Sequence, residues 1–309
     1  MKATRRRWMA GALGLAVAPW EQALSVTKPY QRERSRLLLG VAAYSFRNHF
    51  RFMKGKPNKN FVDGSRELDM AEFIRYGATL GVDSVELTSY FFEPDVTTAS
   101  LAHCREVAHV NGVAIAGTAV GNNFSYPKEA PEREEQMAYV KDWIDKASIM
   151  GAPHVRVFAG RHPKGVEAED AEKYAIENLK IAGDYAAERG IFLGIENHDS
   201  VTTAERLLKI VTAVDNPFVG VNLDSGNFIA DDVYAEMAAS VEYAINVQLK
   251  TEIKVGDGKE KAPADLERVI GILKSGGYAG HVILEFEEKL DPFEHVPEWL
   301  ETLRGYIDA

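Results

Sequence analysis

The chain has 309 residues, 46% of them hydrophobic, and a formal net charge of −10 at pH 7. This length is enough to bury one full core, and the acidic balance excludes nucleic acid as a partner, because phosphates would be repelled. Cys104 is the only cysteine, which excludes an internal disulfide and any metal site built from cysteines.

The first residues have the layout of an export signal. Arg5, Arg6 and Arg7 precede Trp8, and residues 10–18 form a weakly hydrophobic run. We therefore predict a twin-arginine-type signal and a polar linker over residues 1–36, and a periplasmic or otherwise exported protein. A short basic amphipathic tail is the alternative interpretation. No other segment reaches the roughly 18 apolar residues of a membrane span, so we expect no stable membrane insertion after processing.

From residue 37 onward a unit repeats: a segment with helical spacing of apolar residues, a glycine, and a short apolar run. Pro131 opens one such helix, Gly151 ends it, and the run 154–158 follows. The repeat predicts a single (β/α)8 TIM barrel domain over residues 37–309, with a doubly wound open sheet as the alternative. The eight predicted strands are Leu38–Tyr44, Val82–Leu87, Val113–Gly117, His154–Phe158, Ile191–Glu196, Phe218–Asp224, Ala244–Gln248 and His281–Glu285.

Four successive strands end on a residue with an oxygen donor: Glu196, Asp224, Gln248 and Glu285. Because side chains alternate along a strand, all four face the same side, and barrel enzymes carry their chemistry at the C-terminal ends of the strands. Carboxylate and amide oxygens suit a hard divalent ion such as Mn2+ or Mg2+. The set therefore predicts a metal site, although each side chain could instead bind a neighbouring loop amide.

A cation held in this way would polarise a sugar carbonyl and stabilise the enediolate that forms when the neighbouring carbon loses its proton. Glu196 and Glu285 lie on nearly opposite strands of the predicted ring. One of them can remove the proton and the other can return one to the opposite face. These two glutamates are the predicted catalytic residues of an isomerase or epimerase.

Further polar residues share the inward face. Arg156 either contacts substrate or neutralises buried carboxylates, and Glu86 either contacts substrate or supports Arg156. His198, just beyond its strand, is a candidate for substrate contact. Lys250 continues the inward alternation, and we expect it to pair with Glu252 or to reach the substrate.

Two long interruptions, residues 45–65 and 121–131, each follow a strand. Both would therefore rise over the active face of a barrel, where they would serve as substrate walls or remain solvated loops.

The ordered set of motifs resembles a known family. The segments that carry the resemblance are Gly194-Ile195-Glu196-Asn197-His198, Asn222-Leu223-Asp224-Ser225-Gly226-Asn227, Val247-Gln248-Leu249-Lys250 and Gly277-Tyr278-Ala279-Gly280 ahead of Glu285. They are similar to the xylose isomerase-like TIM barrels of the sugar phosphate isomerases and epimerases, a family that includes ketose epimerases, inosose dehydratases and type II apurinic endonucleases.

By this resemblance the metal ligands are Glu196, Asp224, Gln248 and Glu285, separated by 28, 24 and 37 residues (196 to 224, 224 to 248, 248 to 285). The two glutamates would be both ligands and acid/base residues. Mn2+ is the cofactor that the resemblance implies first, with Mg2+ and Co2+ as alternatives.

Three positions depart from the ketose epimerase pattern. Gln248 stands where a histidine ligand is usual, and Asn227 replaces a histidine that often follows the aspartate. Lys254 lies where these enzymes tend to have a substrate-binding arginine. We therefore expect Asn227 and Lys254 to bind substrate. We expect the metal to be held more loosely than by imidazole, to be a different metal, or to be absent.

The first functional hypothesis is a metal-dependent isomerase or epimerase of a non-phosphorylated keto sugar, since an exported protein rarely meets sugar phosphates. The second is a metal-dependent lyase or hydratase of 3-keto glycosides, in which a β-substituent leaves from the same enediolate. The third is a metal-free carbohydrate-binding barrel. An endonuclease would need many histidine ligands and a basic face. The expected partner is a small carbohydrate, and a homo-oligomer is compatible with the sequence.

Overall fold

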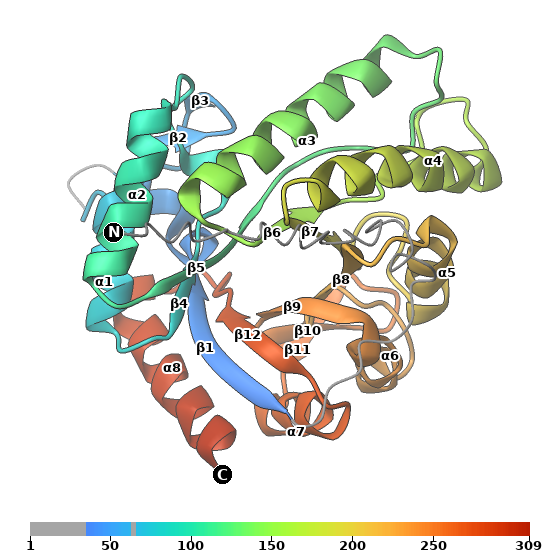
Figure 1. Ribbon diagram of the computed structural model, residues 1–309. Helices are drawn as coiled ribbons and strands as arrows, with labels where there is room; N and C mark the ends of the chain where they lie inside the picture. Colours follow the sequence, from blue (N-terminus) through green and yellow to red (C-terminus); the bar gives the residue numbers. More distant parts are fainter. Residues whose placement is uncertain (1–34, 63–65) are drawn as a thin grey trace, which may run out of the picture.

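The computed structural model describes residues 35–62 and 66–309. Within them, eight parallel strands close into a barrel whose order around the ring is β1-β12-β9-β8-β7-β6-β5-β4 (Figure 1). The strands are β1 (Arg36–Ala42), β4 (Ser84–Glu86), β5 (Ala114–Ala119), β6 (His154–Val157), β7 (Phe192–Glu196), β8 (Val219–Asp224), β9 (Ala244–Leu249) and β12 (Ala279–Leu284). The closed ring confirms the predicted barrel over the open sheet. The predicted export signal lies outside the described residues, as does its linker except for the last two positions, 35 and 36.

Helices connect successive strands and lie around the outside of the ring (Figure 1). They are α1 (Met70–Thr79), α2 (Thr98–Val110), α3 (Pro131–Met150), α4 (Ala168–Ala187), α5 (Ala204–Val214), α6 (Val233–Ser240), α7 (Leu266–Ser275) and α8 (Pro292–Asp308). Helix α3 begins at Pro131 and ends at Gly151, whose φ of 75° is the left-handed conformation that glycine adopts without strain. Both ends agree with the sequence prediction.

The two faces of the strands differ in polarity. Outward side chains such as Leu193, Leu223 and Leu284 belong to the large apolar core beneath the helices. The interior of the ring is mainly polar, with a small apolar cluster of Ala42, Ala116 and Ile283. Helices therefore stabilise the barrel from outside by burying apolar area, and the interior is free to carry charged and amide side chains.

Inside the ring, His154 fits between two strands that carry glycine opposite it. A Cβ atom at Gly117 would lie 2.6 Å from His154 Nδ1, and one at Gly194 would lie 2.4 Å from Nε2. These strands, β5 and β7, flank β6. Because any larger residue would clash with the imidazole, the two glycines are what allow this layer of the barrel to close.

The structure adds two hairpins that the sequence did not predict. One is β2 (Phe52–Met53) with β3 (Lys56–Pro57), and the other is β10 (Glu252–Val255) with β11 (Glu260–Pro263). Both lie in segments that follow barrel strands. The first strand also ends earlier than predicted, because a 3-10 helix takes over at Ala43–His49. Two further 3-10 turns occupy Ser89–Phe91 and Val241–Tyr243.

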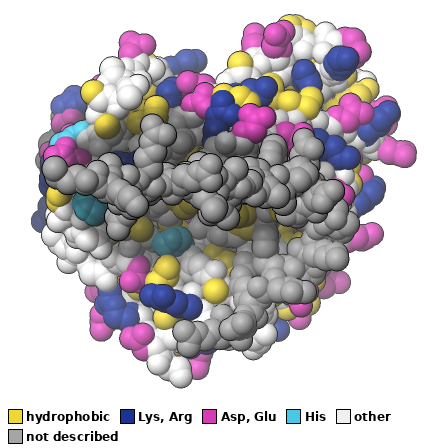
Figure 2. Space-filling view, in the orientation of Figure 1, with side chains coloured by type: hydrophobic (Ala, Val, Ile, Leu, Met, Phe, Trp, Pro, Cys, Tyr) yellow, Lys and Arg dark blue, Asp and Glu magenta, His cyan; other side chains and the backbone are white. Residues whose placement is uncertain are grey.

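On the part of the surface that Figure 2 shows in colour, acidic and basic side chains are interspersed. None of the helices in the described residues combines the length and the apolar character needed to cross a membrane.

Candidate active site

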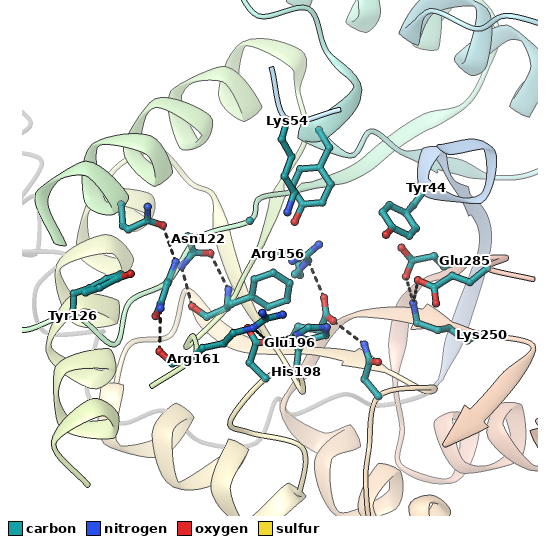
Figure 3. A pocket seen from close by; sticks show the side chains of 18 residues that line it. Tyr44, Lys54, Asn122, Tyr126, Arg156, Arg161, Glu196, His198, Lys250 and Glu285 are labelled. Carbon is teal, nitrogen blue, oxygen red and sulfur yellow. Dashed lines mark hydrogen bonds and ion pairs between the residues drawn. The ribbon is translucent and has the colours of Figure 1, made fainter. Parts of the chain in front are cut away.

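A cavity of about 520 Å³ opens at the C-terminal end of the barrel strands, a size typical of small-molecule sites (Figure 3). Every barrel strand contributes a lining residue at or beyond its end. The polar and aromatic side chains that line it are Tyr44, Lys54, Tyr90, Asn122, Asn123, Tyr126, Gln136, Arg156, Phe158, Arg161, Glu196, His198, Asp199, Asn227, Lys250, Glu285 and Glu287.

The first charged pair of the cavity joins strands β6 and β7. Arg156 Nε lies 2.9 Å from Glu196 Oε2, and Asn227 Nδ2 donates to the other oxygen, Oε1, at 2.9 Å. A second guanidinium nitrogen donates to the Val120 carbonyl at 3.0 Å. Burial disfavours the charged form of Arg156, but the Glu196 carboxylate together with Tyr90, Glu285 and Glu86 outweighs this and raises its pKa. Arg156 is thus a permanent cation fixed beside Glu196.

The second charged group surrounds Lys250, on the right in Figure 3. Its ammonium lies 2.8 Å from Glu285 Oε2, 3.0 Å from Glu287 Oε1 and 3.2 Å from Asp224 Oδ2. Burial opposes the charge, but the three carboxylates together raise the pKa of Lys250 well above its usual value. This lysine is therefore charged at any physiological pH, and it neutralises part of the acidic rim.

Asn197 positions the aspartate of this group. Its side chain accepts a hydrogen bond from the Asp224 backbone N–H at 2.8 Å and donates to the Asp224 carbonyl at 2.8 Å. The backbone N–H of Gly226 donates to Asp224 Oδ1 at 2.8 Å. The ends of β7 and β8 are thereby locked in register, which fixes the direction of the Asp224 carboxylate.

A third polar group borders the cavity near its mouth. His198 Nδ1 lies 3.0 Å from Asp199 Oδ1, which also pairs with Arg161 Nε at 2.6 Å. Burial lowers the pKa of His198, but Asp199 together with the Glu196 and Asp224 carboxylates outweighs it, and the net shift is upward. His198 also packs on Phe158, with ring centroids 4.8 Å apart.

Two lining residues have unusual backbone conformations. Lys54 and Asp199 both have φ of 54°, and among the described residues only one other non-glycine residue, Asp215, has a positive φ. Such a conformation costs energy, and it tends to be found at functional positions. At Lys54 it allows the tight turn between β2 and β3, which aims the ammonium over the Tyr90 ring at 4.3 Å from the centroid.

One layer deeper, four buried side chains form a closed hydrogen-bond network. Gln248 Nε2 donates to Glu86 Oε1 at 2.7 Å, and Gln248 Oε1 accepts from Asn222 Nδ2 at 2.7 Å. Asn246 Nδ2 donates to Asn222 Oδ1 at 2.8 Å and to Glu86 Oε2 at 3.2 Å. Burial, followed by the nearby Glu285 carboxylate, raises the pKa of Glu86 to about 7. This layer is separate from the residues that line the cavity.

A model of the family described as xylose isomerase-like TIM barrel matches residues 74–303, most of the barrel. The chain belongs to this family. Among curated proteins, no sequence matches it.

Solved structures resemble this xylose isomerase-like barrel over most of its length. A 3-keto-D-glucoside 4-epimerase from E. coli aligns with a TM-score of 0.66 and 14% identity, covering 87% of this chain and 100% of its own. A D-psicose 3-epimerase from Clostridium cellulolyticum H10 aligns with a TM-score of 0.66 and 17% identity, covering 88% and 97%. An L-ribulose 3-epimerase aligns with a TM-score of 0.64 and 15% identity, covering 88% of this chain and 94% of its own. At these identities the likeness establishes the fold.

The family resemblance assigns four side chains to a metal ion, but in this xylose isomerase-like barrel all four form ion pairs or hydrogen bonds with other side chains. Glu196 pairs with Arg156, while Asp224 and Glu285 pair with Lys250. Both polar atoms of the Gln248 amide belong to the deeper network, and Gln248 does not line the cavity. Among the described residues, no group of three or more His, Cys, Asp or Glu side chains is arranged to hold a metal ion. The side chains present therefore do not fit a divalent ion bound at these four positions.

The predicted substrate-binding residues separate into two sets. Arg156, His198, Asn227 and Lys250 line the cavity together with the predicted catalytic pair. Glu86 does not, because it is fully buried in the deeper network.

Lys254 lies outside the cavity lining as well, because its strand β10 forms a hairpin with β11 and places it opposite Lys261. The predicted pairing of Lys250 with Glu252 is wrong. Glu252 pairs with Lys261 at 3.2 Å, because the chain leaves the barrel after Lys250 and enters this hairpin.

Sequence reasoning missed several residues of the site. The two long interruptions do form cavity walls, through Lys54 in the first and through Asn122, Asn123 and Tyr126 in the second. Glu287 could have been found from the sequence, because it continues the inward alternation from Glu285. The remaining missed residues, which no local pattern marks, are Gln136, Phe158, Arg161 and Asp199.

Proposed function

We propose that this protein is an isomerase or epimerase that acts on a keto sugar by removing and returning a proton on a carbon beside a carbonyl. The observation that carries this proposal is a pair of glutamates, Glu196 and Glu285, that line one cavity at the ends of β7 and β12. Each has a cation fixed beside it, Arg156 or Lys250. The fold shared with epimerases of 3-keto-D-glucoside, D-psicose and L-ribulose supports the same class of reaction.

The proton balance of the reaction fits this pair. One glutamate takes the proton from the carbon next to the carbonyl, and the electrons of the broken C–H bond form an enediolate. The other glutamate gives a proton to the opposite face of that carbon, which forms the new C–H bond. Because epimerisation runs in both directions, each glutamate is the base in one direction and the acid in the other.

The walls of the cavity suit an uncharged or weakly charged sugar. Tyr126 offers an aromatic face for the ring, while the carboxylates of Glu196, Glu285 and Glu287 offer acceptors for hydroxyl groups. The twin-arginine-type signal predicted at the N-terminus supports a non-phosphorylated substrate met outside the cytoplasm. Cell fractionation with and without an Arg5, Arg6 to Lys substitution would test export, and retention of the wild-type protein in the cytoplasm would contradict it.

A lyase or hydratase of 3-keto glycosides is the second candidate, and Tyr44 favours it. The Tyr44 phenol lines the cavity together with both glutamates. In this position it could protonate a departing β-substituent, whereas a simple epimerisation needs only the two glutamates. A metal-free carbohydrate-binding barrel remains the alternative from another class.

One experiment separates these functions. Keto sugars and 3-keto glycosides are incubated with the purified protein in D2O, and the products are followed by NMR and mass spectrometry. Deuterium uptake with all substituents retained supports an epimerase or isomerase. Loss of a substituent supports the lyase. Binding without exchange or cleavage of any compound in the panel would overturn both enzymatic proposals and favour the binding barrel.

A further inference from the structure

We propose that the ammonium of Lys250 is the resident cation of this site, so that the protein binds no divalent ion among its rim carboxylates and uses the lysine charge instead. The role assigned to this charge, stabilising the enediolate, rests on the proposed function. The exclusion of a divalent ion rests on geometry alone.

Three carboxylates lie around the ammonium. Lys250 Nζ donates to Glu285 Oε2 at 2.8 Å and to Glu287 Oε1 at 3.0 Å, and it forms an ion pair with Asp224 Oδ2 at 3.2 Å, an oxygen that accepts no hydrogen bond. The Lys250 side chain is only 9% exposed, and that of Asp224 is 1% exposed. A divalent ion bound by these carboxylates would need the space and the oxygens that the ammonium already uses.

The local sequence builds a place for this lysine. The stem of Lys250 lies over Gly226, where a Cβ would come within 2.7 Å of Lys250 Cδ and 3.0 Å of its Cβ. The Lys250 backbone N–H donates to Ser225 Oγ at 2.8 Å. The two residues after Asp224 therefore hold the lysine in place. Ser225 accepts a hydrogen bond from its backbone, and Gly226 leaves room for its side chain.

Gln248, the fourth ligand expected of a metal site, is also bound to other side chains. The Gln248 amide donates to Glu86 and accepts from Asn222, two residues on other strands. Turning its oxygen toward the rim would leave the Glu86 carboxylate without its shorter hydrogen bond, in a place where water cannot replace it. The rim carboxylates are therefore already paired with a cation, and the Gln248 amide of the deeper layer is not free to bind a metal ion.

Glu287 is the partner that a substrate can displace. Its side chain is 30% exposed, against 8% for Glu285 and 1% for Asp224. The N–H directed at Glu287 is therefore the donor that a sugar oxygen can take over at least cost, with Asp224 and Glu285 still holding the ammonium. Placed beside Glu285, this donor would stabilise the negative charge that develops on the enediolate oxygen.

Manganese binding tests this inference without a known substrate. Free Mn2+ gives a six-line EPR signal that weakens on binding. We expect the wild-type protein to leave this signal unchanged, and Lys250→Met to weaken it, because the substitution removes the cation from three carboxylates that can then turn toward a metal ion in the space that the ammonium occupied. Mn2+ should also raise the Tm of Lys250→Met by about 5 °C when it exceeds its Kd about a hundredfold. The wild-type Tm should not respond.

Two controls keep the test decisive if Lys250→Met folds poorly. Lys250→Arg retains the cation and should bind no Mn2+. Lys209→Met removes a lysine that pairs with Glu172 on the helical surface, and it should behave as the wild type. Mn2+ bound stoichiometrically by the wild-type protein would overturn the inference, and so would Lys250→Met folded but unable to bind Mn2+.

Activity provides a separate readout. If a substrate is found, wild-type deuterium exchange should survive EDTA treatment, and loss of exchange that Mn2+ restores would contradict the inference. If no substrate is turned over while the EPR results hold, the proposed function fails and the exclusion of the divalent ion stands.

Discussion

Two layers of polar side chains lie inside this barrel. Both come from inward-facing strand positions, but the carboxylates of one layer are paired with cations and the carboxylate of the other with amides. The rim carboxylates of Glu196, Asp224 and Glu285 are each matched by a cation, and Glu196 and Glu285 line the cavity. The deeper carboxylate, Glu86, is held by the amides of Gln248 and Asn246, beneath the cavity. The comparison teaches that a polar residue at a strand end becomes part of an active site only if its partners leave it facing solvent or substrate.

The largest expected effect is at the rim. Glu196→Gln and Glu285→Gln should each lower turnover by roughly 10³-fold, because an amide cannot accept or deliver the proton. Deuterium exchange measures this, and circular dichroism should show an unchanged fold. If either variant keeps wild-type exchange, that glutamate is not an acid or base of the reaction.

Substitutions in the deeper layer should lower the stability of the fold. Gln248→Met keeps the side-chain size but removes a donor from Glu86 and an acceptor from Asn222, and should lower the free energy of unfolding by about 3 kcal/mol. Urea denaturation measures this loss. Asn227→Ala, which removes a donor from Glu196 beside the cavity, is the matched rim variant and should cost less because water can replace the amide. Equal losses in the two variants would erase the distinction between the layers.

Low pH should also destabilise the protein through His154, which is buried inside the barrel. Burial, with Arg156 nearby, lowers the pKa of His154 from 6.5 to about 3. Below pH 6.5 the imidazole of His154 binds a proton in the unfolded chain but not in the folded protein. The free energy of unfolding therefore falls as the pH drops from 6.5 toward 3 and levels off below that. Between pH 7 and pH 5 this one group should cost about 2 kcal/mol.

The imidazole can be isolated from the many carboxylates that also titrate in acid. His154→Gln should make the free energy of unfolding less dependent on pH in that window, as measured by urea denaturation at both pH values. An unchanged pH dependence would mean that His154 is protonated in the folded state or is not the group responsible.

The smallest expected effect is at the mouth of the cavity. Burial of its ammonium against the cavity wall, followed by Arg156 and Arg161, lowers the pKa of Lys54. Lys54→Met should raise KM about fivefold with kcat nearly unchanged, as expected for the loss of one hydrogen bond to bound substrate. Steady-state kinetics would check this, and a loss confined to kcat would instead place Lys54 in the chemistry.

Much of the fold could be predicted because it depends on short-range patterns. Apolar runs of strand length, separated by helical spacing and a glycine, specify the eight units, and alternation along each strand assigns the inward face. The polar rim of Glu196, Asp224 and Glu285 followed directly from that alternation. The hairpins at 52–57 and 252–263 were missed, because short strands outside the barrel bury little and leave a weak pattern.

The sequence by itself determined the barrel, its inward face and the identity of the carboxylates at its rim, since these follow from the periodicity of apolar residues. Only the tertiary structure decided the partner of each polar group: Arg156 for Glu196, Lys250 for Asp224 and Glu285, and Glu86 for Gln248. The reason is physical. A hydrogen bond or ion pair forms only when two atoms of residues far apart in the chain lie about 3 Å from each other, and the periodicity of the sequence contains no such distances.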